Sequence, residues 1–148
     1  MPIKHVRRQI FVALALIINK NDEVLLAQRH DPKNHGMHGK WEFPGGKVEF
    51  GEHPEDTVVR EAAEEVDLQI SVQNILKNYS WFHPDRPHIQ VILMTYIARA
   101  DNPDAARANC REVKDVVWKS IDAALDMDVI DNNKIILRDL RQALKKNL

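Results

Sequence analysis

The sequence predicts an α/β (α+β) protein in which helices cover a mixed β-sheet. Three observations support this fold class: β-type runs alternate with helical patterns, a polar turn joins the first two apolar runs, and the chain is long enough to bury a hydrophobic core. The 148 residues, 44% of them hydrophobic, can bury the core of one domain. Because no linker or repeat interrupts the pattern, we expect a single domain over residues 1–148.

The first third of the chain is predicted to be mostly extended. Four β-type pieces are expected, at Ile10–Ile18, Glu23–Arg29, Trp41–Phe43 and Lys47–Phe50. The polar turn Asn19–Asp22 predicts that the first two form a hairpin. Proline and glycine make His30–Lys40 a loop, and Pro44–Gly46 is expected to be a tight turn between the other two pieces.

A helix is predicted from Pro54 onward. Proline suits the first helical position, and Glu55 and Asp56 suit the positive end of the helix dipole. A core-facing stripe is formed by Val58, Val59, Ala62, Ala63 and Val66.

Strands and two short helical patterns fill the rest of the chain. Further strands are predicted at Leu68–Val72, Ile75–Phe82, Ile89–Ala98 and Val113–Trp118. Ser120 is expected to cap a brief helix that ends at Leu125. Asn132 or Asn133 is expected to cap a final helix, in which apolar residues recur every four positions.

Composition excludes several classes of protein. The formal net charge of −1 gives no basic footprint for a nucleic acid polymer. A single cysteine, Cys110, excludes an internal disulfide framework and favours a reducing, cytoplasmic location. The apolar run Ile10–Ile18 is too short to cross a membrane, and no cleavage site of a signal peptide follows it.

Three glutamates share one face of the predicted helix. At about 100° per residue, Glu64 and Glu65 lie about 60° and 40° to either side of Glu61. Such like charges destabilise a helix unless a positive charge lies between them. A divalent cation such as Mg²⁺ meets this need, because it prefers oxygen ligands. The alternative is a solvated helix with an ordinary ion pair between Arg60 and Glu64.

The segment from Gly46 to Leu68 resembles the signature of the Nudix hydrolases, Gly-x5-Glu-x7-Arg-Glu-U-x-Glu-Glu-x-Gly-U, where U is a bulky aliphatic residue. Matching positions are Gly46, Glu52, Arg60, Glu61, Glu64, Glu65 and Leu68. Asp67 stands in place of the family glycine, and Ala62 is smaller than the usual aliphatic residue. The resemblance implies a Nudix-type α/β/α sandwich with a mixed sheet between helices.

The resemblance also implies roles for individual residues. Metal binding, of Mg²⁺ or alternatively Mn²⁺, would fall to Glu61, Glu64 and Glu65, with Glu52 supporting the cluster. Arg60 would be structural, and Gly45 and Gly46 would permit a tight backbone turn.

Outside this signature, the chain resembles the MutT-like nucleoside triphosphate pyrophosphohydrolases. The similarity covers Lys40–Lys47 and Phe82–Ile89, and it makes Glu112, six residues before Trp118, a further metal ligand or general base. A surface glutamate at the start of a strand is the alternative for Glu112. The general base is expected among Glu64, Glu65 and Glu112.

Four residues are candidates for substrate binding. An amide suits a purine edge, so Asn132 or Asn133 is expected there, with helix capping as the alternative. Phe82, with Trp81 beside it, is expected to stack on a base, and Arg29 to meet a phosphate. A core aromatic and a surface arginine are the respective alternatives.

The resulting hypothesis is a nucleotide hydrolase. A nucleoside triphosphate, including an oxidised purine such as 8-oxo-dGTP, would be cleaved to the monophosphate and pyrophosphate by a monomer or homodimer. The alternatives are a Nudix diphosphatase for CTP, a nucleotide sugar or a dinucleotide, and a non-catalytic nucleotide-binding module. The last is disfavoured because all four carboxylates of the signature are present.

Overall fold

A computed structural model describes residues 4–146, so the predicted domain of residues 1–148 extends beyond it at both ends. The strands are β1 (Arg8–Ile17), β2 (Glu23–Arg29), β3 (Trp41–Glu42), β4 (Gly45–Lys47), β5 (Ile70–His83), β6 (Arg86–Ala100) and β7 (Val113–Ser120). The helices are α1 (Pro54–Val66), α2 (Ile121–Leu125) and α3 (Asp131–Lys145), with a 3₁₀ turn at Pro103–Ala105.

These strands form two sheets within the described residues. One is mixed, with the order β4-β1-β6-β5, and the other is antiparallel, with the order β3-β2-β7. The parallel pair is β1 with β6, in register from Arg8 opposite Ile89 to Ile17 opposite Ala98. The predicted mixed sheet between helices is therefore present, together with a second, smaller sheet.

The predicted hairpin of the first two strands is wrong. β1 and β2 belong to different sheets and meet only at a bridge between Ile18 and Val24, beside the predicted turn. Both strands are interior strands, since β1 pairs with β4 and β6, and β2 with β3 and β7. Their nearly continuous apolar runs match this position, but such runs do not identify the neighbouring strands.

The Gly45-Gly46 pair is likewise not a turn. Both glycines lie in β4, opposite Leu14 and Ala13 of β1. A Cβ atom on Gly45 would overlap with the carbonyl oxygen of Ala13. Glycine is required here for the close approach of two backbones rather than for a reversal of the chain.

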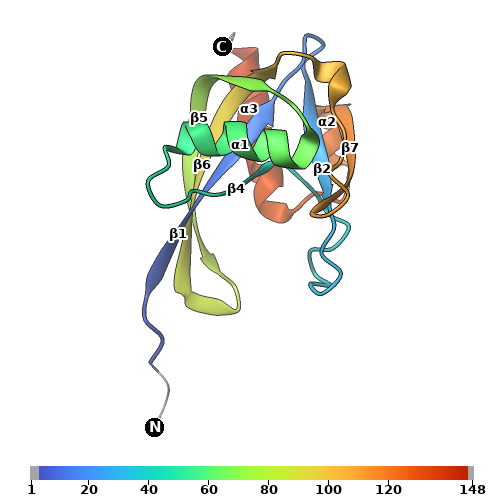
Figure 1. The fold of residues 1–148 in the computed structure, drawn as a ribbon. Coiled ribbons are helices and arrows are strands. Elements are labelled where there is room, and N and C mark those ends of the chain that lie inside the picture. Colours follow the sequence, from blue (N-terminus) through green and yellow to red (C-terminus); the bar gives the residue numbers. More distant parts are fainter. Residues whose placement is uncertain (1–3, 147–148) are drawn as a thin grey trace.

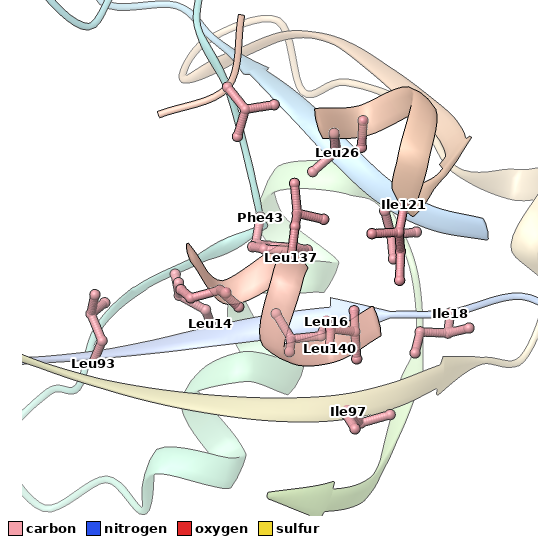
Figure 2. Packing of buried hydrophobic residues seen from close by; sticks show 14 residues of the cluster. Leu14, Leu16, Ile18, Leu26, Phe43, Leu93, Ile97, Ile121, Leu137 and Leu140 are labelled. Carbon is pink, nitrogen blue, oxygen red and sulfur yellow. The ribbon is translucent and has the colours of Figure 1, made fainter. Parts of the chain in front are cut away.

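Helices cover the sheets on both sides, which gives three layers (Figure 1). On one side α1 packs against small residues of β1, including Ala13 and Ala15. On the other side α3 packs against larger residues, and Figure 2 shows Leu140 close to Leu16 of β1 and Leu137 close to Phe43. Since side chains alternate along a strand, β1, β2 and β6 each contribute buried residues to both clusters.

A long β5–β6 hairpin replaces the separate strands predicted between residues 68 and 98. Its ladder runs from Ile70 opposite Ala100 to His83 opposite Arg86, with irregularities in β5 after Val72 and after Ile75. The tip of the hairpin projects with the start of β1 away from the helices (Figure 1). In the described part of the chain, no helix is both long and apolar enough to cross a membrane.

Candidate active site

Helix α1 sets the direction of three carboxylates. Its apolar side is anchored in the core by Val58, Ala62 and Val66. The neighbouring side carries Glu61, which is 12% exposed in its side chain, and the more exposed Glu64, at 57%. Glu65 is buried. The Glu61 carboxylate lies against β4, so closely that a Cβ on Gly46 would overlap with it.

Arg60 lies between the carboxylates and binds three of them. Its Nε donates to Glu52 Oε2 at 2.8 Å, and a second nitrogen donates to Oε1 of the same residue at 3.1 Å. The other terminal nitrogen donates to Glu61 Oε1 at 3.0 Å and to Glu64 Oε2 at 3.3 Å. Arg60 also donates to the carbonyl of Lys47 at 3.3 Å. The guanidinium thus connects α1 with the preceding loop and the end of β4.

Glu52 is held in its ionised form by these contacts. Its Oε1 accepts from Thr57 Oγ1 at 2.7 Å and from the backbone N–H of Glu49 at 3.2 Å. The hydrogen bonds from Arg60 contribute most, followed by that from Thr57, and they lower the pKa of Glu52 to about 2. Glu52 therefore keeps its negative charge over the whole physiological pH range.

Glu65, in contrast to Glu52, lies in an environment that favours its protonated form. Burial raises its pKa well above the usual value, and the hydrogen bond and negative charge of Glu61 raise it further. The charges of Glu42 and Glu112 act in the same direction. Carboxylates from α1, β3 and the loop before β7 are therefore near enough to Glu65 to raise its pKa, although they are distant in the sequence.

Glu42, on β3, was not among the sequence-predicted site residues. Its Oε2 is buried and has no hydrogen-bond partner within residues 4–146. Arg29 Nε lies 3.6 Å from this atom and 3.8 Å from Asp31 Oδ2. Burial raises the pKa of Glu42, although the charge of Arg29 lowers it. The structure thus brings Arg29 close to the carboxylates through Glu42.

Glu112 lies in an ordered loop at the entrance to β7. Asn109 Oδ1 accepts from the backbone N–H groups of Arg111, Glu112 and Val113 at 3.0, 3.1 and 3.0 Å. The carbonyl of Glu112 accepts from the N–H of His30 at 2.9 Å. The Glu112 side chain remains exposed, and the loop is fixed on both sides of it.

The two candidate asparagines lie in the first turn of α3, and the prediction that either caps the helix is wrong. The N-cap is Ile130, one residue before the helix starts at Asp131. Asn133 is buried instead, and its Oδ1 accepts from the backbone N–H of Phe43 at 2.9 Å. Asn132 is half-buried. Asn133 therefore links α3 to the segment that leads into β4.

Phe82 is not brought together with the asparagines. It is 65% exposed near the tip of β5, whereas its neighbour Trp81 packs against the core cluster beneath α3. Trp81 also stacks on Tyr79, with ring centroids 5.3 Å apart. Because side chains alternate along a strand, Phe82 faces away from the side of the sheet on which α3 lies.

The profile of the NUDIX domain matches residues 8–140, which is well over half of the chain. The chain belongs to the NUDIX family. It is a MutT-like Nudix hydrolase, an enzyme that acts on nucleotide anhydrides. The matched range includes the carboxylates of α1, Glu42 and Glu112, together with most of α3.

Relatives of known activity resemble this Nudix chain over much of its length. It is 31% identical to the 8-oxo-dGTP diphosphatase of Proteus vulgaris over 105 residues, which are 71% of this chain and 91% of that protein. It is 37% identical to the 8-oxo-dGTP diphosphatase of Escherichia coli over 79 residues, which are 53% of this chain and 60% of that protein.

A solved structure of a MutT protein, from Methanosarcina mazei, resembles the fold with a TM-score of 0.76 and 23% identity. The match covers 97% of this chain and 99% of that one. The predicted Nudix α/β fold is thereby confirmed.

Nudix enzymes typically depend on a divalent metal, and the donor set present here fits one. Within residues 4–146, no three His, Cys, Asp or Glu side chains are already arranged as a metal cage. The carboxylates nevertheless outnumber Arg60 and Arg29, and two observations indicate that they are not fully balanced: neighbouring negative charges help to raise the pKa of Glu65, and the buried Glu42 Oε2 has no hydrogen-bond partner in the described chain. Carboxylate oxygens are the ligands that Mg²⁺ prefers.

A signal for Glu42 was present in the sequence. In the extended piece Trp41-Glu42-Phe43, alternation places Glu42 on the opposite side from two large apolar residues. Glu42 pairs with Ala27 of β2, whose side chain packs in the cluster beneath α1. A carboxylate on a short strand and directed toward the helix of the Nudix signature is thus a candidate site residue.

Proposed function

We propose that this Nudix hydrolase cleaves a nucleoside triphosphate to the monophosphate and pyrophosphate, with Mg²⁺ or Mn²⁺ as cofactor. The observation that carries the proposal is the carboxylate side of α1, where Arg60 hydrogen-bonds to Glu52, Glu61 and Glu64 and the Glu61 carboxylate lies against β4. This excess of carboxylate repels a triphosphate unless cations bind between the two. The two relatives named 8-oxo-dGTP diphosphatase support an oxidised purine nucleotide as substrate.

The metal would be held by Glu61, Glu64 and Glu65, with Glu52 fixing Arg60 beside them. When bound, it supplies charge neutralisation for the phosphate oxygens. Arg60 keeps Glu61 and Glu64 in position through its hydrogen bonds. The general base, which orients or deprotonates water, is one of Glu64, Glu65 and Glu112.

Two further groups would bind the nucleotide. Arg29 is about one-third exposed and lies beside Glu42, which places a fixed positive charge at the edge of the carboxylates. Asn132, half-buried at the start of α3, offers a donor and an acceptor for a base edge. Asn133 already uses its carbonyl oxygen on Phe43, so it positions the segment that leads into β4, and its amide group remains for the base.

The decisive experiment is pyrophosphate release from a nucleotide panel in the presence of Mg²⁺. We expect 8-oxo-dGTP or another purine triphosphate to give the highest kcat/KM. A preference for CTP would support the alternative indicated by the 42% identity over 59 residues to the CTP pyrophosphohydrolase of Escherichia coli. Hydrolysis of only a nucleotide sugar or a dinucleotide would overturn the triphosphate assignment, and no hydrolysis of any compound would indicate a binding module.

Variants of α1 test the site itself. Glu65→Gln keeps the shape of the buried side chain but cannot lose a proton to become a carboxylate, so we expect turnover to fall by about 100-fold or more. Glu55→Gln is the matched control, because it makes the same change at an exposed position of the same helix. Near-normal turnover of Glu65→Gln in a folded protein would refute the assignment.

A further inference from the structure

A cavity of about 600 Å³ lies at the projecting end of the mixed sheet, and none of the predicted active-site residues except Phe82 lines it. It is formed by the start of β1 and the tip of the β5–β6 hairpin. The residues that matter here are Arg7, Arg8, Gln9, Phe82, His88 and Gln90. Its volume is typical of pockets that bind small molecules.

The lining is cationic and contains no acidic residue. All ion pairs within residues 4–146 are made by other basic residues: Arg29, Lys40, Arg60, Lys77, Arg107 and Arg141. The guanidinium groups of Arg7 and Arg8 thus have no carboxylate partner in the described chain. Desolvation lowers the pKa of His88, and the positive charges of His5 and Arg8 lower it further. The cavity is therefore suited to an anion.

One wall of the cavity is formed by an exposed aromatic side chain and a row of hydrogen-bonded polar side chains. Phe82 is 65% exposed, so most of its side chain faces solvent. Gln9 Nε2 donates to Gln90 Oε1 at 2.8 Å, and Gln90 Nε2 donates to Ser80 Oγ at 2.8 Å. This row of hydrogen bonds crosses β1, β6 and β5 and fixes the two amides beside the aromatic ring.

We propose that this cavity is a second nucleotide-binding site. Arg7, two residues before Gln9, would bind the phosphate, since one guanidinium group can donate two parallel hydrogen bonds to phosphate oxygens. Arg8, on the other side of the strand, would add positive charge at the edge of the cavity. The ring of Phe82 would stack on the base. The amides of Gln9 and Gln90 would meet the polar edge of the base. The inference goes beyond the proposed function, because binding here requires neither the carboxylates of α1 nor a metal.

The test is an NMR titration of the whole protein with GMP in EDTA, so that binding through a divalent metal does not contribute. We expect saturable shifts at the backbone amides of Gln9, Phe82 and Gln90. We expect Phe82→Ala to weaken binding by about tenfold or more. Its matched control, Ile75→Ala, removes another exposed apolar side chain of β5 and should leave the dissociation constant within a factor of about two.

A double variant tests the phosphate contacts. Arg7→Ala with Arg8→Ala should weaken GMP binding by about tenfold or more, whereas Lys20→Ala with Lys119→Ala, an equal loss of charge elsewhere, should not. Shifts confined to α1 and β4, or no shifts at millimolar GMP, would overturn the proposal. A single-stranded oligonucleotide serves as a comparison: much tighter binding of this probe at the same amides would overturn the assignment of a free nucleotide as ligand. Because hydrolysis is not measured, failure here leaves the proposed function intact.

Discussion

Arg60 and Glu52 form the most strongly connected charged pair of the site. The two parallel hydrogen bonds between them use the planar fork of arginine, which lysine does not have. The same guanidinium then reaches Glu61 and Glu64, so it reduces the repulsion between carboxylates of neighbouring helical turns. Glu52 contributes to the site by holding this arginine in position.

The lowered pKa of Glu52 predicts a specific dependence of stability on pH. A carboxyl group whose pKa falls on folding stabilises the native state above its unfolded pKa, and this contribution is lost as the pH falls. For Glu52 the loss extends from about pH 4.5 down to about pH 2. Glu52→Gln should be less stable than the wild type at pH 7, and the difference should shrink across this range in urea denaturation.

The control for this measurement is Glu55→Gln, which removes a charge three residues after Glu52, in the first turn of α1. Glu55 has no hydrogen bond or ion pair with Arg60 in residues 4–146. A difference between Glu52→Gln and wild type that stays constant from pH 7 to pH 2 would contradict the proposed role of the Arg60 contacts.

Asn133 gives a second prediction at the scale of one residue. Asn133→Ala leaves the buried N–H of Phe43 without an acceptor, so the free energy of unfolding should fall by about 1–3 kcal/mol. Asn132→Ala, at the half-buried neighbouring position, should change stability by about 0.5 kcal/mol or less. Chemical denaturation of both variants measures this, and equal losses would show that the Phe43 contact is not important.

At the scale of the element, helix α1 ends at a residue that differs from the Nudix signature. Asp67 stands in place of the family glycine and adopts a left-handed conformation, with φ of 56° and ψ of 38°. Its N–H donates to the carbonyl of Ala62. Aspartate tolerates this region better than most residues but less well than glycine. It also puts a negative charge at the negative end of the helix dipole.

Asp67→Gly should therefore stabilise the protein, by about 0.5–1 kcal/mol. The gain is limited because the exposed ion pair of Asp67 with Arg107, at 3.3 Å, is lost as well. The adjacent, exposed Gln69 has no positive φ, so Gln69→Gly should not stabilise the protein. Thermal unfolding of the two variants provides the comparison, and a destabilised Asp67→Gly variant would contradict the strain argument.

Elements whose signals are local were predicted well from the sequence. Pro54 begins α1, and Ser120 caps α2 by accepting from the N–H of Ala123 at 3.1 Å, both as predicted. The pairing of β1 was missed because its ten-residue parallel ladder lies with β6, a strand about eighty residues later. Hydrophobic pattern shows that a strand is buried but not which strand lies beside it.

At the scale of the molecule, local sequence pattern likewise does not show which distant segments meet at the site. The carboxylates of α1 lie within one turn of helix, so spacing alone was enough to place them on one face. Glu42 and Glu112 are near enough to Glu65 to raise its pKa because β3 and β7 flank β2 in the smaller sheet. Phe82 shows the reverse: its aromatic character indicated base stacking, but its position on β5 places it at the projecting end of the sheet.

Charge is distributed unevenly over the molecule. Between Glu42 and Glu65 there are eight acidic residues and two basic ones, while the projecting end carries Lys4, Arg7, Arg8 and Arg86 beside a single aspartate, Asp85. The net charge of −1 therefore averages two surfaces of opposite sign. The projecting end therefore attracts a negatively charged ligand. The acidic segment repels such a ligand until cations bind its carboxylates.

This excess of negative charge predicts that divalent metal stabilises the whole fold. A ligand that binds only the native state at about 100 times its dissociation constant adds about 2.7 kcal/mol to the free energy of unfolding. The pKa of Glu65 is raised in the metal-free protein, so folding favours the protonated side chain. The contribution of Glu65 to stability is therefore fully present below its unfolded pKa and is lost as the pH rises. Metal binding displaces the proton, so the rise of Tm with Mg²⁺ should be larger at pH 8 than at pH 6.

Differential scanning fluorimetry with Mg²⁺ against EDTA, at matched ionic strength, measures this rise of Tm without any substrate. Glu65→Gln should lose most of the increase, because its side chain lacks the charge that Mg²⁺ neutralises, while Glu55→Gln should keep it. The same Tm in Mg²⁺ and in EDTA for the wild type would mean that the carboxylates do not bind metal in the free protein. The metal would then have to arrive with the phosphates of the nucleotide, and α1 would be stabilised only in that complex.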